Sequence, residues 1–278
     1  MVATPIGNLA DITLRALHVL QLVDAIACED TRHTQTLLRA YGIERSAAAL
    51  IALHQHNEAE AASQLITRLR GGERLAYVSD AGTPAVSDPG ARLVAAVRVA
   101  GLTVVPLPGA SSVTTALSAA GAVDEHGAFV FAGFLPAKAG ERATAVQALA
   151  AEPRAVVLLE APHRIEALAA ALAPLGERPV TLGRELSKQF EQIVTQPAAG
   201  LAAWLAADTQ RTRGEFVVVL HPQATAGDSE GVGLRVLELL LAELPLKSAV
   251  RLAAEITGTP RNTLYEAALK LKKDTDDA

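Results

Sequence analysis

The chain is poor in several features that would place it in a specialised class of protein. It has one cysteine, Cys28, which excludes an internal disulfide and fits a reducing compartment such as the cytoplasm. No apolar run reaches the roughly 18 residues that span a bilayer, so we expect no membrane segment. Aromatic residues make up only 3% of the chain, which disfavours the stacked-base platforms of single-strand binders.

Signatures of common nucleotide and metal sites are also absent. There is no P-loop and no G-x-G-x-x-G, which argues against binding of a nucleoside triphosphate or a dinucleotide. There is no HExxH or CxxC, and His33, His54 and His56 alone make no zinc pattern, so we expect no metal. No G-x-S-x-G supports a serine hydrolase. The net charge of −5 argues against tight nonspecific nucleic-acid binding but leaves a local basic patch open.

The chain does have the composition of a core-forming globular protein, with 278 residues of which half are hydrophobic. In the first half, short apolar stretches alternate with stretches of helical periodicity. The expected strands are 2–3, 25–28, 50–53, 74–78 and 103–107, and helices that follow them end near residues 22, 41, 70, 100 and 120. This alternation predicts a parallel sheet.

The pattern changes near residues 123–127, where we place a domain boundary. The expected strands beyond it are 128–132, 155–159, 180–184, 190–195 and 215–220, with helices near 141–151, 163–175 and 198–207. Two consecutive strands, 180–184 and 190–195, predict an antiparallel pair and therefore a mixed sheet. We predict an α/β fold with domains at 1–122 and 123–222.

The C-terminal part is expected to be helical. Residues 223–233 are typical of a linker. Helices are expected at 234–244, 247–257 and 261–272, and the turn at 257–260 is typical of a helix-turn-helix. We predict a small helical domain at 233–273.

The most informative stretch is the loop 79–90, with the sequence SDAGTPAVSDPG. It lies between an expected strand and an expected helix, and loops at the carboxyl ends of strands line the ligand crevice of an open α/β sheet. Its hydroxyls and carboxylates suit a neutral or cationic ligand with sugar hydroxyls better than a polyanion. The alternative is a tight loop in which Asp80 and Asp88 only cap backbone amides.

Polar clusters also follow the other expected strands of the first half. They are residues 4–8, 29–33, 54–58 and 108–112. Because parallel strands bring their carboxyl ends to one edge of a sheet, these clusters predict a single cleft. In the second half, Arg164, Arg184 and Lys188 follow strands in the same way, with surface ion pairing as the alternative role.

These motifs together resemble the tetrapyrrole methylase superfamily. The resemblance rests on TPIGNLADIT at 4–13, EDTR at 29–32, the loop 79–90, Pro108-Gly109 and GFLP at 133–136. It spans nearly the whole chain and implies two α/β domains with S-adenosylmethionine in the cleft between them. Within the superfamily the match is to homodimeric enzymes that methylate a cytidine 2′-hydroxyl in 16S rRNA of the small ribosomal subunit.

The resemblance also implies which residues contact the cofactor. Carried over by motif, they are Pro5, Ala81, Gly82, Thr83, Val86, Ser111, Ser112, Glu160, Thr195 and Gly214. One departure from the family is that only residues 1–3 precede the first motif, where relatives usually have several more, so the native start is left open.

A ribose hydroxyl is a poor nucleophile until a base takes its proton. The candidates on the predicted cleft edge are Asp30, His33, His56, Glu58 and Asp88, and the sequence does not choose among them. Since the chain is acidic, we expect modest RNA affinity, with phosphate contacts at Arg32, Arg164, Arg184 and Lys188.

Two other functions stay open. A methyltransferase of this fold could act on a small molecule of the tetrapyrrole type, although the helical tail and the match at 29–32 favour RNA. A non-enzymatic RNA-binding protein could instead use the helix-turn-helix and would bind no cofactor.

Overall fold

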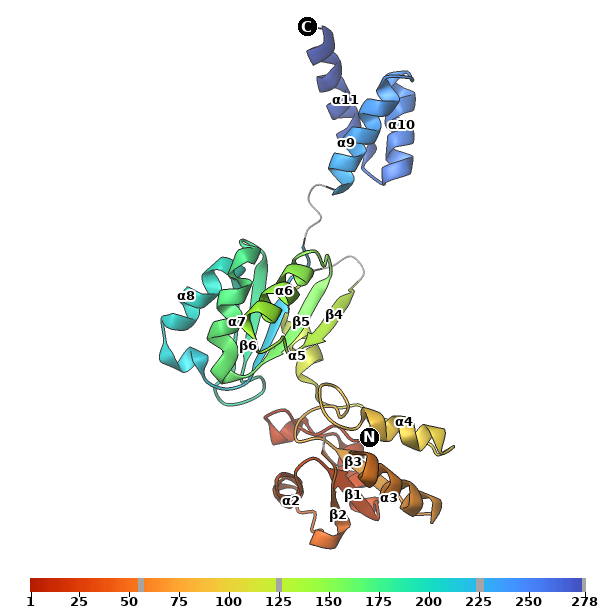
Figure 1. The fold of residues 1–278 in the computed structure, drawn as a ribbon, viewed down its shortest axis with the longest axis vertical. Helices are drawn as coiled ribbons and strands as arrows, with labels where there is room; N and C mark the ends of the chain where they lie inside the picture. Colours follow the sequence, from red (N-terminus) through yellow and green to blue (C-terminus); the bar gives the residue numbers. More distant parts are fainter. Residues whose placement is uncertain (55–57, 124–126, 224–227, 277–278) are drawn as a thin grey trace. The chain divides into compact units, whose positions relative to one another are not determined.

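The computed structural model describes residues 1–54, 58–123, 127–223 and 228–276 (Figure 1). The chain divides into two compact units, Met1–Pro222 and Gln223–Ala278. The first unit holds two β-sheets and the second unit is helical. The α/β fold predicted from the sequence is confirmed.

The first sheet has the strand order β2-β1-β3, and all pairs are parallel, as predicted. Its strands are β1 (Ala25–Cys28), β2 (Leu50–Ala52) and β3 (Leu75–Val78). The helices of this half are α1 (Leu14–Leu22), α2 (Thr31–Ala40), α3 (Glu58–Arg70) and α4 (Ala91–Val99), with short 3-10 helices at Leu9–Asp11 and Ala47–Ala49.

The central strand β1 is buried along its whole length because helices cover both faces of the sheet. Ile26 and Cys28 pack with Leu20 of α1 and Leu38 of α2 on one face. Ala27 packs with residues of α3 and α4 on the other face. The continuous apolar run Ala-Ile-Ala-Cys therefore has the pattern of a strand with no solvent-facing side.

The strands expected at 2–3 and 103–107 do not form, and this part of the prediction is wrong. These segments instead meet in an isolated parallel bridge between Val2 and Leu107. The Val2 amide donates to the Tyr77 carbonyl at 2.9 Å, which places residue 2 beside β3. Pro106 has no N–H to donate, so the second segment lacks a donor that a ladder requires.

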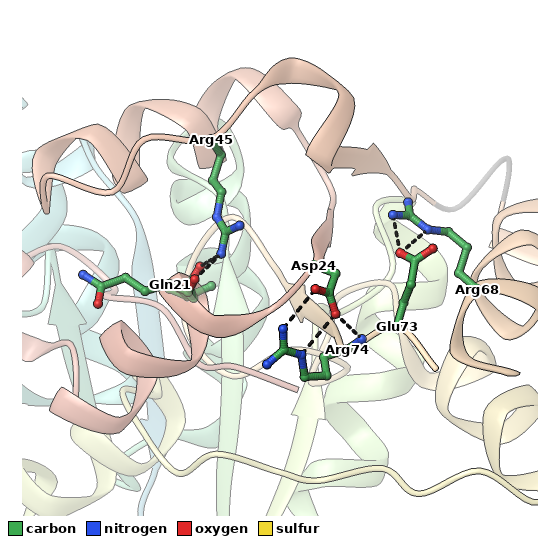
Figure 2. Close-up of polar contacts among 7 residues, drawn as sticks. Gln21, Asp24, Arg45, Arg68, Glu73 and Arg74 are labelled. Carbon is green, nitrogen blue, oxygen red and sulfur yellow. Dashed lines mark hydrogen bonds and ion pairs between the residues drawn. The ribbon is translucent and has the colours of Figure 1, made fainter. Parts of the chain in front are cut away.

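Polar side chains fix the start of the β1–β3 pair (Figure 2). The Asp24 amide donates to the Arg74 carbonyl at 2.8 Å, and the Arg74 amide donates to Asp24 Oδ2 at 2.7 Å. The Arg74 guanidinium also donates to Asp24 and holds the pKa of this carboxyl down at about 2. These bonds immediately precede the Ala25–Leu75 pair and set its register.

The end of α1 is also closed by a side chain: Arg45 donates hydrogen bonds to the Leu20 and Gln21 carbonyls there (Figure 2).

The second sheet has the order β4-β5-β8-β6-β7 and is mixed, as predicted. Its strands are β4 (Phe129–Gly133), β5 (Ala155–Glu160), β6 (Pro179–Arg184), β7 (Gln192–Pro197) and β8 (Phe216–Leu220). Only β4 and β5 pair in parallel. The α-helices are α6 (Ala139–Ala150), α7 (Ile165–Leu172) and α8 (Leu201–Ala206), and 3-10 helices lie at Pro162–Arg164, Ala173–Leu175, Ala198–Gly200 and Thr209–Thr212.

The two faces of the second sheet are covered from different parts of the chain. Helices α6, α7 and α8 pack on one face (Figure 1). The other face is covered by α5 (Ser112–Ala120), whose Val113 and Ala116 pack with Val157 and Val219. Thus α5, which the sequence analysis assigns to the first half, packs on the second sheet. The domain boundary at 122/123 stays a prediction.

The C-terminal unit consists of α9 (Asp228–Leu241), α10 (Leu246–Thr257) and α11 (Arg261–Asp276) around Leu237, Ala253 and Leu264. The linker expected at 223–233 is too long, since α9 begins at Asp228. Gly233 reads as a linker residue in the sequence, but it is buried, and a Cβ there would lie 2.4 Å from Thr259 Oγ1. Glycine is therefore needed for close packing. None of the described helices is long and apolar enough to cross a membrane.

Gly90 is a position where a side chain is expected to disturb this fold strongly. Its φ is +121°, and a Cβ would lie 2.6 Å from Tyr77 Cε1, within a ring whose hydroxyl donates to the Pro89 carbonyl. Gly90→Ala should lower the free energy of unfolding by about 2 kcal/mol. Gly140→Ala in α6 is the matched control, because a Cβ there would meet nothing within 4 Å. Alanine favours the helix over glycine, so this variant should be slightly more stable than the native protein. Urea denaturation measures both, and equal stability of the two variants would contradict the prediction.

Candidate functional site

Four segments that are far apart in the sequence meet at one rim, as predicted. The Thr4 amide donates to the Gly82 carbonyl at 2.9 Å, and the Gly82 amide donates back to Thr4 at 3.0 Å. Thr83 Oγ1 donates to the Ala110 carbonyl at 3.0 Å. The Asp30 amide donates to Asp80 Oδ1 at 3.3 Å, which ties the end of β1 to the same loop.

The loop 79–90 is held in an unusual conformation. Ala85 and Ser87 have φ of +69° and +63°, in the left-handed region that side chains rarely adopt. At its end, the buried Glu58 carboxylate accepts from the Gly90, Arg92 and Leu93 amides at 3.1 to 3.3 Å. Glu58 thereby fixes both the loop and the first turn of α4.

A cavity of about 310 Å³ lies beside this loop. It is within the usual size range of small-molecule sites, about 300 to 1,000 Å³. Of the residues expected to contact a cofactor, those that line it are Ala81, Gly82, Thr83, Val86, Ser111, Ser112 and Glu160. Apolar side chains, among them Ile6, Phe134 and Leu159, form much of the remaining wall.

Three other residues expected at the cofactor do not line the cavity. Pro5 is buried next to Ile6, which does. Thr195 shares a hydrogen bond of 2.7 Å with Thr181 on the neighbouring strand. Gly214 has φ of +86° and lies against Glu185, directly before the lining residue Glu215. Their predicted role stays a prediction.

The second half contributes a charged wall built on strand ends. Glu160 at the end of β5 has a fully buried side chain. Its Oε1 accepts from the Ala161 amide and pairs with Arg164, while Oε2 is buried without a hydrogen-bond partner among the described residues. Lys188 Nζ donates to Glu185 at 2.9 Å and to Glu215 at 2.8 Å.

The loop containing Lys188 also contacts the first half. The Asn8 amide donates to Ser187 Oγ at 3.2 Å. A Cβ on Gly7 would lie 2.3 Å from Lys188 Cγ, so only glycine allows this approach. Both sides of the cavity are thus joined beside it.

The cavity carries more negative than positive charge. Among the described residues that line it, Asp88, Glu160 and Glu215 are acidic and Lys188, which is already paired, is the one cation. Burial, together with the nearby negative charges of Glu29 and Asp80, raises the pKa of Asp88 to about 6. Such a lining favours a cationic ligand over a polyanion.

Among the candidate bases, only Asp88 lines the cavity in the described residues. Asp30 caps α2 and pairs with Arg32 at 2.9 Å, which holds the pKa of Asp30 at about 2. His33 is exposed on α2, and Glu58 is committed to the start of α4. His56 lies outside the described residues.

Most of the cations expected to contact RNA are engaged within the protein. Arg164 donates to the Leu135 carbonyl and pairs with Glu160. Arg184 donates to the Arg213 carbonyl at 3.2 Å, and Lys188 is paired as above. Arg32 is largely exposed, with its guanidinium against Asp30. Their predicted contact with RNA stays a prediction.

Sequence reasoning missed several residues of this site. Phe134 belongs to the GFLP motif, which could have indicated it. Glu29, directly after β1, raises the pKa of Asp88 more than Asp80 does. Leu186 and Glu215 meet because Arg184 of β6 pairs with Phe216 of β8. That register has no signal in the sequence.

Comparison with known proteins places the chain in a family. The family model "Tetrapyrrole (Corrin/Porphyrin) Methylases" matches residues 1–202, and the model "RsmI C-terminal HTH domain" matches residues 226–272. The chain is 50% identical over 275 residues to the ribosomal RNA small subunit methyltransferase I of Pseudomonas aeruginosa, covering 97% of this chain and 96% of the relative. The protein of the same name from Escherichia coli O157:H7 is 50% identical over 273 residues, covering 97% and 94%.

A solved structure shares the fold at low sequence identity. It is the uroporphyrin-III C-methyltransferase from Thermus thermophilus complexed with S-adenyl homocysteine, with a TM-score of 0.52 and 17% identity, covering 78% of this chain and 94% of that one. The chain therefore belongs to the tetrapyrrole (corrin/porphyrin) methylase family, in the branch that contains the two relatives from P. aeruginosa and E. coli.

Proposed function

We propose that the protein transfers the methyl group of S-adenosylmethionine to the 2′-hydroxyl of a cytidine in 16S rRNA. The observation that carries the proposal is the cavity between the loop 79–90 and the ends of β5 and β8, lined by hydroxyls and carboxylates. The names of relatives at 50% identity support ribosomal RNA of the small subunit as the substrate. The structural neighbour complexed with S-adenyl homocysteine supports the cofactor.

The residues present fit such a cofactor. The buried Oε2 of Glu160 has no hydrogen-bond partner in the described part of the chain and is an acceptor in need of a donor. Ser111 and Ser112 line the same cavity beside apolar Val86 and Phe134, which suits a ligand with both polar and flat apolar parts. We infer that these residues hold the cofactor. The chemistry it supplies when bound is an activated methyl group on a sulfonium sulfur.

Asp88 is the residue that we assign as general base. A carboxylate with a pKa of about 6 is ionised at neutral pH yet basic enough to share the proton of a hydroxyl in the transition state. The strained loop fixes its position, so that the acceptor oxygen can be aligned with the methyl group. The homodimer implied by the resemblance stays a prediction, which sedimentation would check.

The substrate is tested by methyl transfer in vitro. Purified protein with labelled S-adenosylmethionine is offered small ribosomal subunits, free 16S rRNA and a tetrapyrrole such as uroporphyrinogen III. Label should enter rRNA, and nucleoside mass spectrometry should find it in 2′-O-methylcytidine. Label in the tetrapyrrole alone, or in a base rather than a ribose, would contradict the proposal.

The role of Asp88 is tested by the pH dependence of kcat. In the native protein, kcat should rise with pH through about 6 and then level off, because the base must be deprotonated. Asp88→Asn should lower kcat about 100-fold at pH 8 and remove this inflection. Glu44→Gln is the control, because it removes an exposed carboxylate away from the cavity; its kcat and the inflection near pH 6 should be unchanged. If Asp88→Asn had the kcat of the native protein, Asp88 would be excluded as the base.

Asp88→Asn, which should lower kcat, should at the same time raise the stability of the folded protein. The pKa of Asp88 is higher in the folded protein than in the unfolded chain, so its ionisation opposes folding, and stability falls as pH rises from about 4 to 6. Asp88→Asn should therefore stabilise the protein at pH 7 by about 1 kcal/mol, allowing for solvent screening at this half-buried site. Denaturation at pH 7 and pH 4 measures the effect; a destabilised variant at pH 7 would show that the carboxylate is structurally required.

A further inference from the structure

A groove on the C-terminal unit is not part of the cavity described above. It lies between α10 and the first turns of α11 and has a volume of about 270 Å³. The residues that line it are Lys247, Val250, Arg251, Arg261, Asn262 and Tyr265. All of them except Val250 are exposed, and Val250 belongs to the core of the unit and forms the floor.

The groove concentrates positive charge in a chain that is acidic as a whole. Arg251 and Arg261 both approach the same carboxylate, Glu255, at 3.3 Å. Lys247 has no ion-pair partner in the part of the chain that the structure describes. Three cations thus face one anion. Both ion pairs are exposed, so they contribute little to stability and can be exchanged for contacts with another anion.

We propose that this groove binds the phosphate backbone of the RNA substrate. The inference rests on the proposed function, since it takes 16S rRNA as the partner. A protein with net charge −5 needs a local cluster of cations to bind a polyanion. Of the four cations of the first unit that were expected to serve, Arg164, Arg184 and Lys188 are partly buried and engaged with protein groups, and Arg32 is exposed. The groove brings three exposed cations together in one place.

The remaining side chains of the groove suit the same ligand. Asn262 offers an amide N–H donor and Tyr265 a hydroxyl donor beside the cations. Amides and hydroxyls of this kind commonly contact phosphate oxygens next to Arg and Lys, and such contacts set the register of a protein on the nucleic acid without reading its sequence. The groove would therefore supply affinity and orientation, and no part of the methyl-transfer chemistry.

The test uses the full-length protein and two double variants that remove the same charge. Lys247→Gln/Arg251→Gln neutralises the groove, and Arg235→Gln/Lys270→Gln neutralises two exposed cations of the same unit that do not line it. Circular dichroism and calorimetry with S-adenosylmethionine verify folding and cofactor binding in each. Binding to labelled 16S rRNA is measured by fluorescence anisotropy at several salt concentrations.

The groove variant should bind 16S rRNA about tenfold more weakly at 0.1 M salt. Its slope of log affinity against log salt should be shallower by about 1.5, because each lost phosphate contact removes about 0.7 to 0.9. The KM for rRNA should rise with little change in kcat, and the control variant should resemble the native protein. Equal affinity and slope in the two variants would overturn the inference.

Two further outcomes separate this inference from the proposed function. If the native protein transfers no methyl group to rRNA but its RNA binding depends on the groove, the proposed function is wrong and the inference that the groove binds RNA phosphate is supported. If the groove variant loses affinity for small ribosomal subunits but not for deproteinised 16S rRNA, the groove binds a ribosomal protein and the assignment to RNA phosphate is overturned.

Discussion

The loop 79–90 can form the wall of a cavity because it is pinned at several points. Reciprocal backbone hydrogen bonds join Thr4 and Gly82, the Thr83 hydroxyl holds the Ala110 carbonyl, and the Glu58 carboxylate holds the amides at the far end. These contacts maintain Ala85 and Ser87 in left-handed conformations that cost free energy. Without them the loop would relax, and the hydroxyls and carboxylates that face the cavity would no longer point to a common place.

The electrostatics of the site follow from this arrangement. Glu29 and Asp80 follow the ends of β1 and β3, and the repulsion of Asp88 by their charges combines with burial to keep the pKa of Asp88 high. Across the cavity, Lys188 is neutralised by Glu185 and Glu215, so the lining stays acidic. Repulsion among these carboxylates opposes folding, but it also makes the cavity favour a cationic ligand and gives Asp88 a basicity suited to a general base. The basic groove is located in a separate compact unit.

Much of the fold and part of the site could be predicted from local patterns. The alternation of apolar strands and helices identified the parallel and mixed sheets, and the polar clusters at strand ends correctly predicted that residues 4–8, 79–90 and 108–112 converge. The strands at 2–3 and 103–107 failed because β-propensity there is overridden by a proline and by the short length of the first segment. The linker was predicted to extend as far as Gly233 because a glycine needed for close packing and a glycine in a linker cannot be told apart in the sequence. The positions of Glu215 and Leu186 at the cavity depend on the register of β6 and β8. The ion pairs of Lys188 and Arg164 depend on tertiary contacts. The periodicity of the sequence reveals neither.

The central claim is that the pinned loop and the ends of β5 and β8 enclose the site of the methyl donor. A crystal structure of the protein grown with S-adenosylhomocysteine tests it most directly. The account predicts the ligand between the loop 79–90 and Glu160, with Ser111 and Ser112 beside it and Glu160 Oε2 accepting a hydrogen bond. A ligand bound elsewhere on the molecule, with this cavity filled only by water, would contradict it.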